Sequence, residues 1–186
     1  DNGPELVSAA TEAYFLEQGI RHETSGPHNQ HQNGVAERGI RTIMEMVLCM
    51  LRQSNAPRHL RGHAAKLAAH TRGFTPSNSL EGGETPNSIF YESRVEDGPP
   101  AFNWYQFGCY AVIHRGKQLV KDGKLSDRGI EGIYVGVDTY EKGKCHLVYA
   151  QGRIYRGVDV VCDENYFPYA QFPSDADDPF TPAPQP

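Results

Sequence analysis

The apolar side chains between Asn33 and Gln53 recur at intervals of three and four residues, and no other feature of the sequence limits the possible folds as strongly. Ile40, Ile43, Val47 and Met50 share one side of a helix drawn through this stretch. A period near 3.6 residues, kept up over several turns, is typical of an amphipathic α-helix. The sequence therefore predicts one long helix that must bury an apolar stripe against other parts of the chain.

Shorter elements are predicted on both sides of this helix. Ser8 can cap a helix that runs to about Gln18, and Gly19 then stands where helices commonly end. Pro57 can open a further helix that ends near Gly73, because proline is tolerated in a first turn. Two short elements complete this half of the chain: a strand at 20–24 and a helical turn at 86–91.

From Gln106 onward the pattern changes to short β-strands. Gly and Lys-Gly turns interrupt the apolar runs at intervals of about 8–12 residues, which is typical of a small β-barrel. The predicted strands lie at 109–114, 129–137, 145–149, 152–155 and 158–162. The predicted fold class is therefore mixed α/β, with the helices first and a small β domain after them.

The composition excludes several classes of protein. The chain has 186 residues, of which 38% are hydrophobic. No run approaches the roughly 18 consecutive apolar residues of a membrane span, and no secretory leader is expected. The four cysteines are widely separated, which favours free thiols in a reducing compartment, the nucleus or the cytoplasm. Because the chain starts at Asp1 without a Met, we expect it to be a fragment.

Charge is distributed unevenly, although the net charge is only −5. Between Val35 and Arg72 there are seven Lys or Arg residues and two Glu residues. From Gly157 to the end there are six acidic residues and no Lys or Arg. A basic stretch of this kind can contact a polyanion such as nucleic acid. A solvated helix face explains it equally well.

Two acidic residues occupy positions from which they can converge on one site. Asp1 stands where a strand would end, and Glu37 lies near the start of the long helix, with 35 residues between them. Carboxylates that meet there would suit Mg²⁺, which takes a few rigid oxygen ligands and keeps its other waters. Paired ions of this type stabilise both the attacking and the leaving oxygen in phosphoryl transfer. The spacing alone does not establish such a site, since an Asp and a Glu at this separation are common.

Several phrases of the sequence are more specific than that spacing. DNGPE at the start is followed by GIRHETSGPHNQHQNGVAERGIRTIMEM, in which QNGVAER (32–38) is the most specific part. Four further phrases follow downstream, up to about Phe167: ETPNSIF, FGCYAVI, KLSDRGIEGIYVGV and RGVDVVCDE. Together these phrases resemble the integrase of copia-type LTR retrotransposons, a part of their Pol polyprotein. The resemblance implies the C-terminal part of a ribonuclease H-like catalytic core at 1–75, a linker at 76–105, a small SH3-like β-barrel at 106–168 and a disordered acidic, Pro-rich tail at 169–186.

The resemblance also implies a chemistry. Asp1 and Glu37 would be the second and third acids of the catalytic set and would bind Mg²⁺ or Mn²⁺, while the first Asp would lie upstream of this chain. The activity implied is DNA 3′-processing and strand transfer, with DNA as the partner and a homo-oligomer as the full-length protein. The isolated chain is expected to be inactive, because one metal ligand is missing. The alternative is a non-catalytic DNA-binding or assembly remnant of a transposable element.

Four further residues are candidates for DNA contact: Gln32, Asn33, Arg38 and Arg41. An Arg beside a metal site can hold a phosphate with two hydrogen bonds. Each has a simpler interpretation as well. Asn33 can serve only to cap the long helix, and Arg41 can pair with Glu37 one turn earlier, which would contribute only a few tenths of a kcal/mol.

Overall fold

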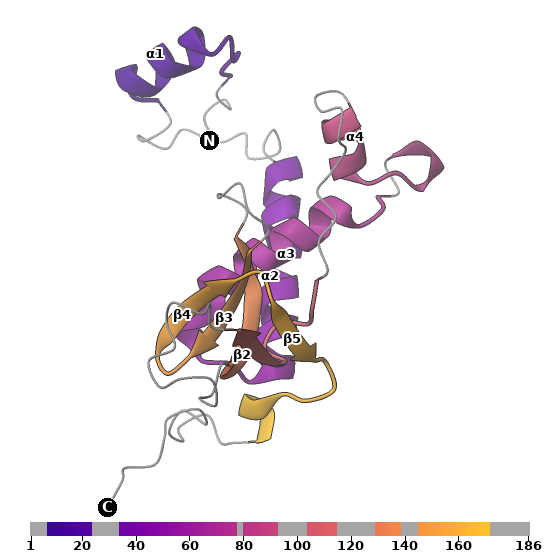
Figure 1. Cartoon of the computed structure of the whole chain (residues 1–186). Coiled ribbons are helices and arrows are strands. Elements are labelled where there is room, and N and C mark those ends of the chain that lie inside the picture. The colour runs from indigo at the N-terminus through magenta and orange to yellow at the C-terminus, as the bar shows by residue number, and fades with distance from the viewer. Residues whose placement is uncertain are drawn as a thin grey trace, which may run out of the picture. The chain divides into compact units, whose positions relative to one another are not determined.

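The computed structural model of the chain describes residues 7–23, 34–77, 80–92, 104–114, 129–138 and 145–171. The chain divides into two compact units, Asp1–Thr42 and Ile43–Pro186. Figure 1 shows the elements: helices come first, and a β-sheet occupies the C-terminal part. The mixed α/β class predicted from the sequence is confirmed in this order of elements. None of the helices in the described ranges combines the length and the apolar character that crossing a membrane requires.

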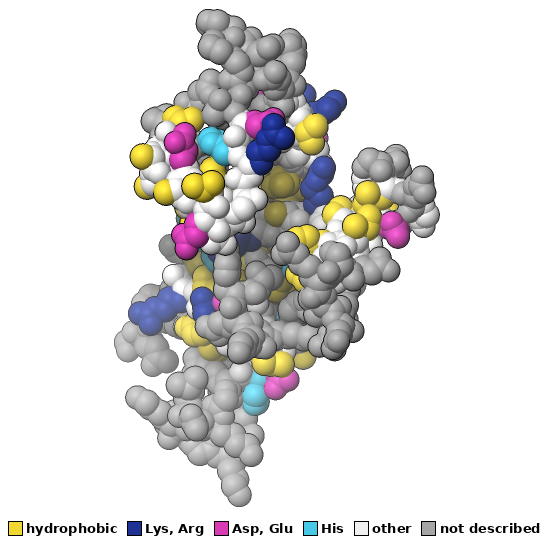
Figure 2. Space-filling model, turned by 90° about the horizontal axis from the view of Figure 1, so that it is seen from above, with side chains coloured by type: hydrophobic (Ala, Val, Ile, Leu, Met, Phe, Trp, Pro, Cys, Tyr) yellow, Lys and Arg dark blue, Asp and Glu magenta, His cyan; other side chains and the backbone are white. Residues whose placement is uncertain are grey.

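In the first unit the predicted N-terminal helix is confirmed as α1 (Ala9–Glu17). The Ser8 hydroxyl caps it by accepting a hydrogen bond from the Thr11 N–H at 3.2 Å, and Gly19 follows in the left-handed conformation with φ +65°. No residue of α1 is buried, and uncovered apolar side chains are visible in yellow in Figure 2. The strand predicted at 20–24 is wrong for residues 20–23, which have no regular structure. A strand needs a partner to accept its backbone hydrogen bonds, and none of the described residues pairs with this segment.

The long helix is confirmed as α2 (Gly34–Ser54), and its apolar residues divide between two sides. Val47 is buried, and Ile43 and Met50 are packed against the same core. The C-terminal half of α2 therefore uses its apolar stripe as predicted, to close a core. At the predicted Pro57 start, a 3-10 turn, η2 (Arg58–Leu60), leads into α3 (Arg61–Phe74). Beyond it lie η3 (Glu81–Gly83) and α4 (Pro86–Glu92), the latter confirming the helical turn predicted at 86–91.

All five predicted strands are confirmed, with small shifts of their ends. They are β1 (Tyr110–His114), β2 (Gly129–Asp138), β3 (Cys145–Ala150), β4 (Arg153–Gly157) and β5 (Val160–Asp163). They form one antiparallel sheet in the order β4-β3-β2-β1-β5. A short 3-10 turn, η5 (Pro168–Gln171), which the sequence did not predict, follows the last strand.

The sheet is open and curled. Within the described residues β4 and β5 are not paired with each other, so an open sheet stands where the resemblance implied a closed barrel. The curl is nevertheless strong. A Cβ added to Gly157 on β4 would lie 2.9 Å from the Ile113 side chain of β1, although β3 and β2 separate these strands in the sheet. One edge of the sheet therefore bends over the strand next to its other edge.

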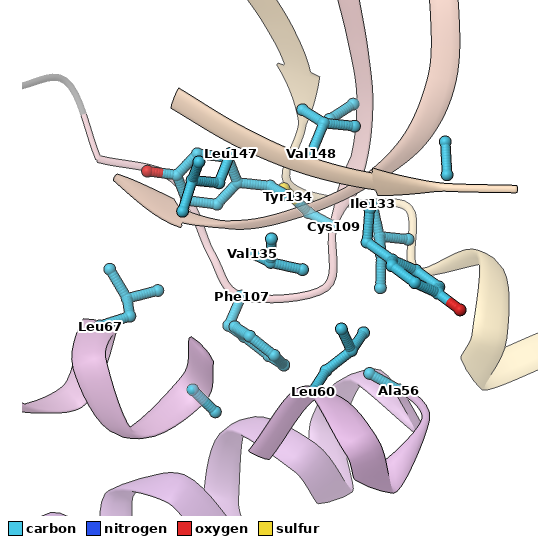
Figure 3. Packing of buried hydrophobic residues seen from close by; sticks show 14 of the residues in the cluster. Ala56, Leu60, Leu67, Phe107, Cys109, Ile133, Tyr134, Val135, Leu147 and Val148 are labelled. Atoms are coloured by element: carbon cyan, nitrogen blue, oxygen red, sulfur yellow. The ribbon is translucent and has the colours of Figure 1, made fainter. Parts of the chain in front are cut away.

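Helices and sheet of the second unit share one hydrophobic core. Figure 3 shows Leu60 and Leu67 pointing from the helices toward Phe107 and Val135 on the sheet side. Leu60 is 2% exposed and Val135 is 1% exposed. Each fully buried side chain of this size contributes about 1.5–3 kcal/mol. The helices are thus part of the folded unit that contains the sheet and are not a separate layer tethered to it.

One close approach fixes where α2 meets the sheet. Gly108, just before β1, has φ +79° and lies against the side chain of Ser54, the last residue of α2. Ser54 is fully buried, and its hydroxyl donates to the Met50 carbonyl at 2.8 Å. A Cβ at position 108 would overlap Ser54. Two separate reasons therefore require glycine at position 108: the left-handed backbone conformation and the close contact with Ser54.

Replacing Gly108 with Ala should lower the free energy of unfolding of the second unit by about 2–5 kcal/mol. About 1–2 kcal/mol is left-handed backbone strain, and the rest is overlap with a packed neighbour. The control is Gly152→Ala in the β3–β4 turn, where φ is +74° but nothing lies within 4 Å of an added Cβ, so only the strain is expected. Urea unfolding followed by fluorescence of Trp104, the only Trp in the chain, measures both. Equal losses in the two variants would contradict the requirement for close approach.

Candidate metal-binding and nucleic-acid site

Glu37 lies in the first turn of α2 with its side chain exposed. A carboxylate in this position interacts favourably with the positive end of the helix dipole. Neither of the ion pairs Arg21–Glu23 and Arg156–Asp138 involves Glu37, and no other residue of the described ranges forms an ion pair with it. The i,i+4 pair with Arg41 that would have explained Glu37 structurally is therefore not formed. The carboxylate oxygens are accessible to an incoming cation.

Two arginines accompany Glu37 on the same helix. Arg38 and Arg41 are both exposed, and the backbone of this turn is braced by the Thr42 hydroxyl, which donates to the Arg38 carbonyl at 3.0 Å. Arg41 lies one turn beyond Glu37 on the same side of the helix, whereas Arg38 lies about 100° around it. The two arginines therefore project from the helix in different directions.

The remaining predicted site residues, Asp1, Gln32 and Asn33, lie outside the described residues. The convergence of Asp1 with Glu37 and the capping or DNA contact of Asn33 therefore stay predictions. In the part of the chain that the structure describes, no three His, Cys, Asp or Glu side chains come together as a metal-binding group. Glu37 alone supplies one hard oxygen ligand, which suits Mg²⁺ in kind and needs further ligands in number.

The basic stretch predicted from the sequence lies on the surface. All seven of its Lys and Arg side chains are exposed: Arg38, Arg41, Arg52, Arg58, Arg61, Lys66 and Arg72. Figure 2 shows Lys and Arg side chains in dark blue at the surface of the molecule. Exposed positive charge of this kind is what contact with a polyanion requires, although a solvated face would have the same exposure.

A second cluster of charged and polar side chains lies in the second unit and was missed in the sequence. His63, Lys66 and His70 line a groove on α3 together with Asp138 of β2 and Arg156 of β4. The spacing of three and four residues could have placed the α3 side chains on one helix face. No sequence signal linked Asp138 to Arg156, because they come from separate strands.

Burial shapes the protonation of the histidines in this cluster. Burial lowers the pKa of His63, and the positive charge of Lys66 and the neighbouring His59 lower it further. Burial also lowers the pKa of His70. Both imidazoles are therefore held in the neutral form near neutral pH, in which one ring nitrogen donates a hydrogen bond and the other accepts one.

The similarity to known proteins extends over most of the chain. It is 34% identical over 165 residues to the retrovirus-related Pol polyprotein from transposon TNT 1-94 of Nicotiana tabacum, a match that covers 89% of this chain and 12% of that protein. It is 28% identical over 172 residues to the corresponding polyprotein from transposon RE1 of Arabidopsis thaliana, covering 92% of this chain and 11% of that protein. The chain thus spans about a tenth of the length of these relatives. No protein-family model matches it.

A much shorter relative matches as well. An uncharacterised mitochondrial protein of Arabidopsis thaliana is 31% identical over 93 residues, which is 50% of this chain and 68% of that protein. The segment shared with this chain therefore makes up most of that relative, and the two proteins belong to one family.

Proposed function

We propose that this chain, a homologue of retrotransposon Pol polyproteins, is the part of such a polyprotein that belongs to its integrase, a metal-dependent polynucleotidyl transferase. In this proposal residues 1–75 correspond to the C-terminal part of a ribonuclease H-like catalytic core, 76–105 to a linker, 106–168 to an SH3-like β domain and 169–186 to an acidic tail, and the helices after Thr42 pack with the β domain as one unit. The complete enzyme processes the 3′ ends of the element's DNA and joins them to target DNA.

The observation that carries this proposal is the exposed carboxylate of Glu37, which forms no ion pair within the described residues and stands at the start of α2 beside Arg38 and Arg41. The position at the positive end of the helix dipole favours a carboxylate without an ion pair, and the absence of the pair with Arg41 leaves its oxygens accessible. The similarity to Pol polyproteins is the reason to assign this carboxylate to a catalytic metal ion. The proposal assigns Glu37 to the metal and leaves Arg41 for phosphate.

Uncovered apolar side chains support the assignment of the first helices to a larger domain. Leu16 of α1 is 83% exposed, and Ile40, Met44 and Leu48 of α2 are 53–63% exposed at successive intervals of four residues. An apolar row of this kind on a helix normally faces a core. We infer that a further part of the catalytic core covers it in the parent polyprotein.

The β-sheet supports the SH3-like assignment of the second domain. Five short antiparallel strands in the order β4-β3-β2-β1-β5 curl until Gly157 of β4 lies against Ile113 of β1. The proposed barrel differs from this sheet in that its two edge strands, β4 and β5, would be paired.

The metal site is proposed to use Asp1, Glu37 and the upstream Asp as ligands. When bound, Mg²⁺ or Mn²⁺ lowers the pKa of a bound water or hydroxyl and neutralises charge on the phosphate oxygens. Glu37 fits this role because its oxygens are hard, exposed ligands on a rigid helix. The attacking oxygen is water in 3′-processing and the DNA 3′-hydroxyl in strand transfer, and both displacements leave the protein unmodified.

The four candidate DNA-binding residues position the strand in this proposal. Arg38 and Arg41 donate hydrogen bonds to backbone phosphates, a geometry to which the planar guanidinium is suited. Gln32 and Asn33 precede the helix and would contact DNA from the loop. The acting form is proposed to be a homo-oligomer, and the partners are the ends of the element's DNA and target DNA.

The short mitochondrial relative favours a second candidate function. Because the shared segment makes up 68% of that protein, sequences of this type also occur outside long polyproteins. In that setting the chain would be a non-catalytic DNA-binding or assembly remnant of a transposable element. The two candidates differ in whether Glu37 matters for activity of the parent protein.

Replacing Glu37 with Gln in the full-length parent protein should reduce strand transfer about a hundredfold or more. Loss of a metal ligand removes several kcal/mol of transition-state stabilisation. Glu45→Gln is the matched control, since Glu45 is also an exposed glutamate of α2 and its loss should leave the rate unchanged. Rates are measured on labelled DNA ends with Mg²⁺ or Mn²⁺. Equal rates for wild type and Glu37→Gln would exclude the catalytic assignment.

The isolated chain should show no strand transfer with either metal. The proposed first ligand lies outside it, and two carboxylates do not complete the site. The measurement is the same assay on residues 1–186, with the full-length parent as a positive control. Robust turnover by the chain alone would show that the site is built from other residues.

Replacing Arg38 or Arg41 with Gln should weaken DNA binding and make it less sensitive to salt. For each guanidinium that no longer reaches a phosphate, the slope of log affinity against log salt should fall by about 1. Arg153→Gln is the control, because Arg153 is exposed on β4 and lies outside the basic stretch. Fluorescence anisotropy with labelled duplex at several salt concentrations gives the slopes. Unchanged slopes in Arg38→Gln and Arg41→Gln would remove these residues from the DNA interface.

A further inference from the structure

Two of the four cysteines, Cys109 and Cys162, lie together in the sheet of the second unit. Cys109 is fully buried just before β1, and Cys162 is half-buried on β5. Both are free thiols, and a hydrogen bond joins their side chains. Neither is among the residues assigned above to metal or DNA, so the pair is independent of the proposed function.

The strand register places the two thiols on one face of the sheet. In the antiparallel pair of β1 with β5, Cys162 stands opposite Ala111, and Cys109, two residues before Ala111, shares that face. The His114 N–H donates to the Asp159 carbonyl at 3.0 Å, which makes these two residues a hydrogen-bonded pair. Because the two kinds of pair alternate along an antiparallel ladder, Ala111 and Cys162 form a non-hydrogen-bonded pair, the kind in which side chains lie closer together.

A β-bulge at the start of β1 changes the direction of Cys109. In a regular ladder such diagonal neighbours lie about 7–8 Å apart, which exceeds the Cα separation of about 4.4–6.8 Å that a disulfide spans. Here the Gly108 N–H donates to the Tyr134 carbonyl at 2.7 Å, and the Tyr134 N–H donates to the Cys109 carbonyl at 2.9 Å. Two residues therefore face one, and Gly108 at φ +79° makes this a glycine bulge, which bends its strand and redirects the adjoining side chain.

The surroundings decide which thiol reacts first. The hydrogen bond to Cys162 raises the pKa of the Cys109 thiol well above its usual range, and burial and the charge of Glu164 raise it further. Burial and the two sulfurs also raise the pKa of the Tyr134 hydroxyl, and Figure 3 shows Cys109 close to Tyr134 in the core. Since the thiolate is the nucleophile in disulfide exchange, Cys109 does not start the reaction. Cys162 is the more exposed of the two, so an oxidant reaches it first.

From this geometry we propose that Cys109 and Cys162 form a reversible disulfide when the chain meets a low-molecular-weight disulfide such as oxidised glutathione. The Cys162 thiolate attacks one sulfur of the oxidant, which gives a mixed disulfide and a first glutathione thiolate that takes up a proton. The Cys109 sulfur then attacks Cys162 Sγ, and its proton passes to the second glutathione as that thiolate leaves. Two thiols of the chain are oxidised, and one glutathione disulfide is reduced to two glutathione molecules.

The disulfide would link an edge strand to its neighbour. Within the described residues β5 pairs only with β1, and the chain then continues into η5, where the Tyr169 carbonyl accepts a hydrogen bond from Asn55. A covalent link between β1 and β5 holds this edge in place and closes the long loop between Cys109 and Cys162 in the unfolded chain. Oxidation is therefore expected to stabilise the second unit.

The first test is to incubate the whole folded chain with oxidised glutathione, digest it without reduction and analyse the peptides by mass spectrometry. We expect the Cys109 and Cys162 peptides to be linked to each other, whereas Cys49, which is exposed on α2, carries glutathione. Dithiothreitol should separate the linked peptides. Glutathione that stays on Cys162, or a Cys109 thiol that stays reduced, would overturn the proposal, because either shows that the two sulfurs cannot meet.

Urea unfolding then measures whether the bond stabilises the second unit. In a chain with Cys49→Ser and Cys145→Ser, which keeps only the pair, oxidation should raise the urea midpoint by on the order of 1 M, as expected for closing a long loop. The control adds Cys162→Ser to this chain, because a substitution at half-buried Cys162 disturbs the core less than one at Cys109. Its midpoint should be the same with and without oxidant. A midpoint that does not rise on oxidation, or that rises equally in the control, would contradict the proposal.

Discussion

The contact between Ser54 and Gly108 holds the second unit together at the point where its helices meet its sheet. It brings the end of α2 against the turn that leads into β1, so the helices and the sheet must pack as one body. A single polar residue is buried at this junction without penalty because its hydroxyl both donates to Met50 and accepts from the Ala56 N–H. Asn55, in the left-handed conformation, then ties the same junction to η5 by donating to the Tyr169 carbonyl at 3.0 Å. The turn after α2 therefore holds three elements together with few residues.

The long helix α2 has different tasks at its two ends. Its C-terminal half is fixed in the core by Val47 and its neighbours, which gives the helix a rigid base. Its first turn presents Glu37 to solvent, along with two arginines. The helix fixes the backbone of Glu37, while its exposed side chain keeps the rotamer freedom that binding a cation would restrict. The groove beside α3 depends on a different contact. There α3 packs against β2, which brings charged residues of the helix and of the strands into one groove.

The elements were predicted well where a period in the sequence reflects a single helix or strand. The helices α2 and α3 and all five strands follow from apolar spacing and from residues such as Pro57 that favour the start of a helix. The strand predicted at 20–24 failed because a short apolar run says nothing about a partner strand. In the candidate site, the position of Glu37 near the start of a helix was predicted, and its neighbours Arg38 and Arg41 follow from helix geometry. The groove was missed because Asp138 and Arg156 meet only through strand pairing between β2, β3 and β4.

The local structure can be read from the amino-acid sequence because it depends on residues that are near one another along the chain, and the homology to Pol polyproteins and the candidate ligands can be read from it because they are matches of residue identity. The packing of the folded chain was needed to show that the helices share a core with the sheet, that Gly108 must be glycine and that Arg41 does not pair with Glu37. It was also needed to show that the sheet curls and that a groove lined by charged residues opens beside α3. Contacts of this kind join residues tens of positions apart, and their formation depends on how side-chain volumes fill a common interior, which no local pattern encodes.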